Sequence, residues 1–158
     1  MTIVVNVSDA RVSKDPTDTI ATYSLGSCIG VALYDPVCKA GGMLHYQLPN
    51  ASIDAQRAAQ NPFMFADTGM DALLDMLSKV GASKHRLKVK IAGAAQMLND
   101  AGLFSIGRRN HSAIRKILWQ KGLMLEAEAI GGTSPRSIYL NIADGTLTLK
   151  ADGQTSAL

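Results

Sequence analysis

The chain has 158 residues, of which 47% are hydrophobic and 18% are charged. This length suits one domain, and the composition is typical of a folded globular protein rather than a disordered one. No segment approaches the roughly 18 or more apolar residues of a membrane-spanning helix, and residues 1–6 lack the basic region and cleavage site of a secretory signal. We therefore expect a cytoplasmic protein without membrane insertion, in which residues 1–150 form a single domain.

The net charge of +3 raises the question of nucleic-acid binding. Aromatic residues make up only 5% of the chain, which leaves few platforms on which bases could stack. The densest basic stretch, residues 84–91, alternates charged with apolar residues, and this pattern predicts a strand with one solvated face. We therefore expect no nucleic-acid partner and interpret the charge as mild steering toward an acidic one.

The first part of the chain predicts short strands at residues 3–7 and 19–24, on either side of a turn at Asp15-Pro16. The polar segment 50–64 predicts a loop that could border a functional site, because such sites are often built on loops.

Two helices are predicted by apolar residues at helical spacing. These residues are Met70, Leu73, Leu74 and Leu77 in the first helix, and Ile114, Ile117 and Leu118 in the second. The first helix has Asp67 or Thr68 as its cap and stops at Gly81. The second runs from Asn110 to Lys121 and ends at Gly122.

The remaining strands are expected at residues 123–130, 137–142 and 146–150, with a turn at Asp144-Gly145 between the last two. We expect residues 151–158 to form a loose tail. Many strands with only two clear helices indicate an α+β protein, a layered sandwich of mixed β-sheet with flanking helices.

A β-hairpin is the most informative predicted element. Asp35-Pro36 is a turn signal between two apolar runs, and a turn centred between Pro36 and Val37 pairs Cys28 directly with His45. Directly opposed Cβ atoms lie about 4.5–5.5 Å apart. A bulge that shifted the register by one residue would place the two side chains on opposite faces.

A thiol beside an imidazole is a nucleophile beside a base, and an imidazolium can lower a thiol pKa to about 3.5–7.5. Gly26 and Ser27 precede Cys28, and a turn there could leave backbone N–H groups free to hold an oxyanion. Thr22 is the nearest polar residue that could orient the ring of His45. The alternatives are a small buried cysteine, a histidine bonded to backbone, and a threonine that simply suits a strand.

Neither a disulfide nor a metal site is expected. In the predicted hairpin Cys28 and Cys38 lie on the order of 20 Å apart, too far for a disulfide. The two cysteines and three histidines show no zinc-binding spacing, and no glycine-rich phosphate motif is present. We expect no cofactor.

At this point the sequence resembles the chemoreceptor glutamine deamidase family, CheD. The similar blocks occur in order and cover roughly residues 3–150. They are Thr22, Leu25–Cys28, Tyr34–Pro36, Gly42–His45, Leu48–Pro49, Lys90–Met97, Ile106–Asn110 and Gly131–Ser137. Two residues depart from the family pattern, Ser24 and Ala94, because glycine is common at both positions.

The resemblance implies a cysteine hydrolase with Cys28 as nucleophile, His45 as base and acid, and Thr22 orienting the histidine. The implied substrate is a glutamine side chain on the cytoplasmic helices of methyl-accepting chemotaxis receptors, which is converted to glutamate. The implied fold is an α/β sandwich related to the cytotoxic necrotizing factor toxins. Some family members bind the phosphatase CheC, which is therefore a candidate partner.

Two other functions stay open on the sequence. The chain could be a binding module that docks on receptors or CheC without turnover. It could also be a cysteine peptidase or a transglutaminase-like enzyme, since both use the same nucleophile. Ammonia release, peptide cleavage and amine incorporation distinguish these possibilities.

Overall fold

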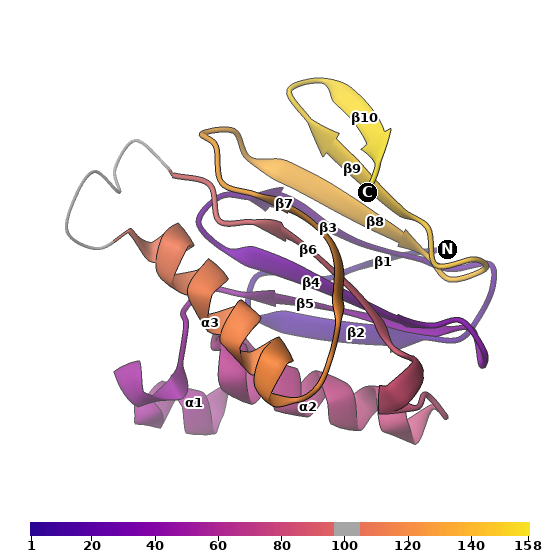
Figure 1. Ribbon diagram of the computed structural model, residues 1–158, viewed down its shortest axis with the longest axis horizontal. Coiled ribbons are helices and arrows are strands. Elements are labelled where there is room, and N and C mark those ends of the chain that lie inside the picture. The colour runs from indigo at the N-terminus through magenta and orange to yellow at the C-terminus, as the bar shows by residue number, and fades with distance from the viewer. Residues whose placement is uncertain (97–104) are drawn as a thin grey trace.

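Two mixed β-sheets pack face to face, and helices cover the outer face of one of them (Figure 1). The computed structural model describes residues 1–96 and 105–158. In spatial order the first sheet contains β1 (Thr2–Val4), β3 (Thr19–Leu25), β8 (Arg136–Asn141), β9 (Leu147–Ala151) and β10 (Gln154–Ala157). The second contains β2 (Asp9–Ser13), β5 (Ala40–Tyr46), β4 (Ile29–Asp35), β6 (Lys88–Gly93) and β7 (Leu125–Ile130). The predicted α+β sandwich is confirmed.

The helical elements follow the order η1 (Ala51–Ile53), α1 (Ala55–Gln60), η2 (Pro62–Met64), α2 (Ala66–Lys79), η3 (Lys84–Arg86) and α3 (Ile106–Gln120). Helices α2 and α3 lie together against the second sheet (Figure 1). No helix among the described residues is long and apolar enough to span a membrane.

Strand β4 lies at the centre of the molecule, and all seven of its residues are buried. Its alternating side chains serve two hydrophobic layers, because successive strand residues point to opposite faces. Ile29, Val31 and Leu33 pack toward the helices, whereas Ala32 and Tyr34 pack toward the other sheet. A strand buried on both faces explains the continuous apolar run in this part of the sequence.

The β4–β5 hairpin forms, but the predicted register is wrong by two residues. Gly30, not Cys28, pairs with His45. The connection is longer than expected because Asp35 pairs with Ala40, and the Asp35 carboxylate accepts N–H groups of the intervening loop. A shift of two residues keeps every side chain on its predicted face, so Cys28 and His45 stay on the same side.

The first half of the chain differs from the expectations in four places. The first strand is shorter than predicted, and strand β2 was not predicted at all. Segment 50–64 is not a loop but contains η1, α1 and η2, because side chains such as Asp54 cap these short helices. Phe65, and not Asp67 or Thr68, is the N-cap of helix α2. The carboxylate of Asp67 instead accepts the N–H of Ala51 at 2.9 Å.

The expectation of a loose tail is also wrong. Residues 154–157 form β10, which pairs antiparallel with β9 through a turn at Asp152-Gly153. Both turn residues have positive φ, 53° and 74°, which is the geometry of the tight hairpin turn that Asp-Gly favours. Lys90 Nζ also donates to the carbonyl of Leu158 at 2.8 Å.

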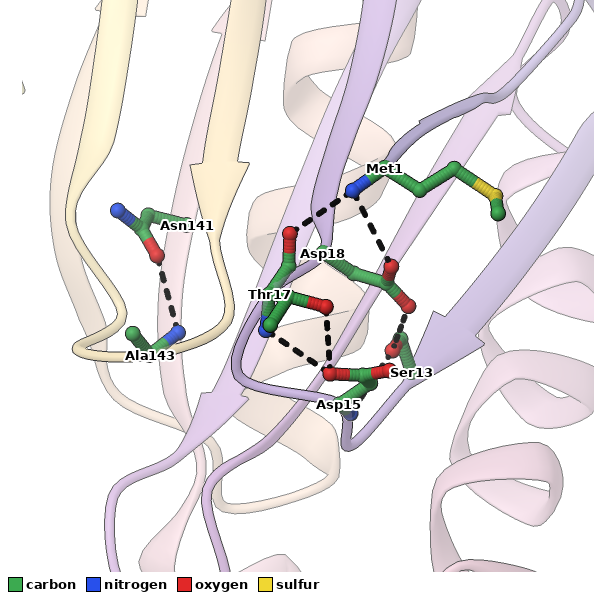
Figure 2. A network of polar contacts seen from close by, with 7 residues as sticks. All are labelled: Met1, Ser13, Asp15, Thr17, Asp18, Asn141 and Ala143. Atoms are coloured by element: carbon green, nitrogen blue, oxygen red, sulfur yellow. Dashed lines mark hydrogen bonds and ion pairs between the residues drawn. The ribbon is translucent and has the colours of Figure 1, made fainter.

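A polar network holds the start of β3 in place (Figure 2). The amino group of Met1 donates to the carbonyl of Thr17 at 2.9 Å and lies 3.7 Å from a carboxylate oxygen of Asp18. Ser13 donates to the same carboxylate at 2.7 Å, and Thr17 donates to Asp15. The connection between β2 and β3 is thereby tied to β1.

Asp35 is the buried ionic centre of the hairpin. Its side chain is fully buried and accepts from Arg86 Nε at 3.0 Å and from the N–H of Ser83 at 2.8 Å, besides the loop N–H groups. Burial opposes ionisation, but these hydrogen bonds outweigh it and hold the pKa of the Asp35 carboxyl well below its usual range. The charged form is therefore favoured by folding.

We expect Asp35→Asn to lower the free energy of unfolding by about 2 kcal/mol at pH 7, because charge-assisted hydrogen bonds are lost. Urea unfolding measures this. Because the carboxyl pKa is lower in the folded protein, its contribution is present above about pH 4 and disappears as the pH falls further. The exposed Asp75→Asn is the matched control. Equal losses in both variants, or an unchanged acid dependence in Asp35→Asn, would contradict the assignment.

Candidate active site

Thr22 and His45 come from different sheets and meet in the layer between them. Thr22 Oγ1 lies 2.7 Å from His45 Nδ1 and donates its proton to the carbonyl of Val5 at 2.8 Å. A hydroxyl has one proton, so the contact to the ring must be an Nδ1–H donating to the hydroxyl oxygen. This arrangement places the ring proton on Nδ1 and leaves the lone pair on Nε2.

The Nε2 atom of His45 is buried and has no hydrogen-bond partner in the described structure. The His45 side chain is only 2% exposed, and this burial lowers its pKa to about 4. The ring is therefore neutral near pH 7 and carries an unengaged basic nitrogen. A buried polar atom without a partner is costly, and a catalytic role is one explanation for such an atom.

Cys28 lies directly before β4 and packs against the same layer between the sheets. The β4–β5 pairing ends at Ile29 opposite Tyr46, so Cys28 lies one residue before the paired strand and two residues before Gly30, the partner of His45. The thiol and the ring therefore lie near the same end of the hairpin but are not directly opposed. Cys28 is partly exposed, whereas Thr22 and His45 are buried.

The expectation that an imidazolium lowers the pKa of the thiol is wrong for the resting protein. Burial raises the pKa of Cys28, and a hydrogen bond from its own N–H only partly offsets this effect. Burial also lowers the pKa of His45. Both shifts disfavour charge, so the resting pair is a neutral thiol beside a neutral imidazole.

Gly30, which pairs with His45, makes room for the Thr22–His45 contact. A Cβ at this position would lie 2.9 Å from Ile138 Cδ1 and 3.3 Å from Thr22 Cγ2. A side chain at residue 30 would therefore force Ile138, Leu25 and Thr22 to shift. The glycine is a sequence signal for this close approach that our sequence analysis did not use.

The segment before β4 is held through its carbonyl groups. Gly26 O accepts from the N–H of Ala95 at 2.8 Å, and Cys28 O accepts from the N–H of Ala94 at 2.9 Å. These contacts fix the backbone that precedes the nucleophile candidate. The role predicted for Gly26 and Ser27, namely backbone N–H groups that hold an oxyanion, stays a prediction.

Asn110 is a site residue that the sequence analysis missed. It is fully buried, and its Nδ2 donates to Ser27 O at 3.0 Å and to Gln47 O at 2.8 Å. Because both partners are carbonyls, the orientation of the amide is determined. The side chain thus links the residue before Cys28 to Gln47, which directly follows β5. The hydroxyl of Tyr46 donates to the backbone carbonyl of Asn110 at 2.7 Å.

A signal for Asn110 was present in the sequence. It occupies the apolar face of α3, four residues before Ile114, where a polar residue needs buried partners. Gly107 lets this helix approach closely, because a Cβ there would lie 2.9 Å from the carbonyl carbon of Ala94. The predicted helix began only at Asn110, whereas α3 begins at Ile106, so the prediction did not place Gly107 and Asn110 together on one helix.

The two departures from the CheD pattern fall at strained backbone positions. Ser24 has a φ of 56° and Ala94 a φ of 53°, in the left-handed region that favours glycine. Ser24 also lies within the irregularity of the β3–β8 pairing. Each departure therefore costs about 1–2 kcal/mol of backbone strain.

The described residues contain no group of three or more His, Cys, Asp or Glu side chains that could hold a metal ion. Cys28 and Cys38 are both free thiols. His111, the other histidine near this end of the molecule, pairs with Glu128 at 2.8 Å.

A thiol, a neutral imidazole and a hydroxyl in one layer of a β-sandwich form an arrangement typical of cysteine hydrolases. The family described as "CheD chemotactic sensory transduction" matches residues 47–151, and the chain belongs to this family.

Similar curated proteins cover nearly the whole chain. One from Solibacter usitatus, named "Probable chemoreceptor glutamine deamidase CheD", is 47% identical over 99% of this chain and 92% of its own. Relatives from Syntrophus aciditrophicus ("Probable chemoreceptor glutamine deamidase CheD 1") and Pyrococcus abyssi ("Probable chemoreceptor glutamine deamidase CheD") are 42% and 41% identical. They match 96% and 94% of this chain, and 94% and 90% of their own.

A crystal structure of the hypothetical protein YfiH from Bacillus licheniformis has a similar fold. It superposes with a TM-score of 0.50 at 14% sequence identity. The match covers 79% of this chain and 51% of the YfiH chain.

We expect Asn110→Asp to loosen the segment around Cys28, because a carboxylate cannot donate to the carbonyls of Ser27 and Gln47. Two lost hydrogen bonds correspond to about 2 kcal/mol. Hydrogen–deuterium exchange should show faster exchange in residues 26–28 and 46–48.

Tyr46→Phe is the matched control for this change, since it removes a hydrogen bond to the backbone of Asn110 but keeps the side-chain contacts. It should lower stability without faster exchange in residues 26–28. Equal exchange in the two variants would show that Asn110 contributes only general stability.

Proposed function

We propose that this protein is a chemoreceptor glutamine deamidase that converts receptor glutamine side chains to glutamate and releases ammonia. The observation that carries the proposal is the unpartnered Nε2 of His45, whose tautomer Thr22 determines, beside the layer between the sheets against which Cys28 packs. The names of the relatives support the choice of substrate.

In the first step the thiol of Cys28 attacks the carbonyl carbon of the glutamine side chain. As the S–C bond forms, the thiol proton moves to Nε2 of His45. Because both groups are neutral at rest, proton transfer accompanies the attack, and the ring acts as a general base. Backbone N–H groups in the Gly26–Cys28 segment hold the developing oxyanion.

In the second step the C–N bond breaks. The His45 imidazolium gives its Nε2 proton to the departing nitrogen, which leaves as ammonia, and a thioester to Cys28 remains. Water then attacks the thioester and passes a proton to Nε2, and this proton returns to the sulfur as the S–C bond breaks. One water molecule is consumed and one ammonia is released, so the chemistry requires no cofactor.

Thr22 acts as a positioning residue through its hydroxyl. A carboxylate in this place would stabilise the imidazolium and raise the pKa of His45. A neutral hydroxyl holds the Nδ1–H tautomer without adding charge to a buried layer. A hydroxyl in place of a carboxylate is consistent with the low pKa of His45 and with a base that stays neutral until attack begins.

The proposal includes partners and location. The protein substrate is the cytoplasmic part of methyl-accepting chemotaxis receptors, and the location is therefore cytoplasmic. CheC is a candidate binding partner, because some members of the family bind this phosphatase.

Cys28→Ala should abolish ammonia release from a soluble cytoplasmic fragment of a chemoreceptor, because the thioester cannot form. Cys38→Ala, which removes the other free thiol, should retain wild-type activity. An enzyme-coupled ammonia assay measures the rate, and mass spectrometry identifies the converted glutamines. Conversion by Cys28→Ala would refute the nucleophile. Peptide cleavage would indicate a peptidase, and binding without conversion by the wild type would indicate a binding module.

The acid limit of kcat/KM should lie near pH 4 rather than near the ordinary imidazole value of about 6.5. Activity needs neutral His45, so it is lost as the pH falls through the pKa of the buried ring. A glutamine-containing receptor peptide serves as substrate, and circular dichroism at each pH controls for unfolding. An acid limit between pH 6 and 7 in the folded protein would refute the neutral resting pair.

A further inference from the structure

Helix α3 forms one wall of a surface groove of about 520 Å³. Pro49 and Asn50, which follow strand β5, and Asp67 at the start of α2 form the other wall. Ala113 and Ile117 provide apolar surface within it.

The positive charge of the protein is concentrated on α3. The helix contains Arg108, Arg109, Arg115 and Lys116 and no acidic residue. Since the whole chain has a net charge of +3, the remainder of the chain carries a net charge of −1. An attraction for acidic partners therefore belongs to this helix rather than to the protein as a whole.

Two cations near the groove have acidic partners, whereas those that line it have none among the described residues. Arg115 lies 3.6 Å from Glu128, and Lys121, just after the helix, pairs with Asp71. Arg108, Arg109 and Lys116 line the groove, are exposed, and form no ion pair with any acid in residues 1–96 or 105–158.

Asp67 is the one acid among the described lining residues of the groove, and Arg108, Arg109 and Lys116 outnumber it. Its carboxylate accepts the backbone N–H of Ala51 at 2.9 Å and of Thr68 at 2.9 Å. It is therefore engaged in fixing the wall to which it belongs. The described lining of the groove therefore has a net positive charge.

The spacing of the groove residues suits a helical occupant. Arg109, Ala113, Lys116 and Gln120 recur every three or four residues and form one stripe along the helix. At 1.5 Å per residue, this stripe is about 16 Å long, or three helical turns. An amphipathic helix could place apolar residues on Ala113 and carboxylates on Arg109 and Lys116.

The groove begins beside the candidate active site. Asn110, which follows Arg109, donates to the carbonyl of Ser27 before Cys28 and to that of Gln47. Pro49, two residues beyond Gln47, is part of the groove wall. A helix bound along α3 would therefore extend toward the nucleophile candidate.

We propose that this groove binds an acidic amphipathic helical segment of the receptor substrate and presents a neighbouring glutamine to Cys28. The inference rests on the proposed deamidase function and adds the surface that selects the substrate. The bound segment contributes carboxylates to the unpaired cations and apolar contact to the floor. Because exposed charges govern encounter more than chemistry, the groove acts mainly on KM.

The test reverses charge within the groove and compares it with the same change elsewhere. Arg109→Glu with Lys116→Glu should raise KM for a soluble cytoplasmic chemoreceptor fragment by about tenfold or more, with kcat changed less than about twofold. Lys14→Glu with Lys150→Glu makes the same charge change at exposed positions outside the groove. This control should change KM by less than about twofold, and added salt should weaken wild-type binding.

A binding measurement separates this inference from the proposed function. In the Cys28→Ala background, fluorescence anisotropy of the labelled fragment should give a dissociation constant at least about tenfold weaker for the groove variant than for the control variant. Ala113→Phe, which fills the groove without changing charge, should also weaken binding.

Failure of the proposed deamidation and failure of the groove assignment would give different results. If the wild type releases no ammonia but the groove variants lose binding, the groove stands and deamidation fails. If the wild type releases ammonia and the groove and control variants bind equally well, the groove assignment is overturned and the proposed deamidation stands.

Discussion

The hydroxyl of Thr22, shared between the carbonyl of Val5 and the ring of His45, is the contact on which the candidate site depends. It joins the two sheets at a buried point and determines which ring nitrogen carries the proton. Gly30 provides the space for it, because any side chain there would meet Thr22 and Ile138. The packing of the two sheets therefore also determines which nitrogen of the His45 ring carries the proton.

Burial sets the electrostatic character of the site. It raises the pKa of Cys28 and lowers that of His45, so the resting protein holds no thiolate–imidazolium pair. In the proposed mechanism, charge develops only as substrate is attacked, when a bound carboxamide and its oxyanion donors can stabilise it. A neutral threonine is compatible with such a site, whereas a carboxylate would charge the ring beforehand. A neutral resting thiol is also less reactive toward other electrophiles in the cell.

Helix α3 connects catalysis with substrate selection in the proposed function. Its buried face carries Asn110, which holds the segment before Cys28, and its exposed face carries the unpaired cations of the groove. Gly107 allows the helix to pack closely against the backbone of Ala94 and Ala95. A substrate helix bound along one side of α3 would thus be positioned relative to a nucleophile held from the other side.

The sequence by itself determined the elements with strong local signals and the face on which each chemical group lies. The periodicity of α2 and α3 predicted both helices, and strand alternation placed Cys28 and His45 on one side even though the register differed by two residues. Only the tertiary structure decided the rest, because it depends on contacts between residues distant in the chain. Asp35 lengthens the hairpin loop while bonded to Arg86 and Ser83, and the tautomer of His45 depends on Val5 through Thr22. The pKa shifts of Cys28 and His45 arise from burial, which only the packed sandwich creates.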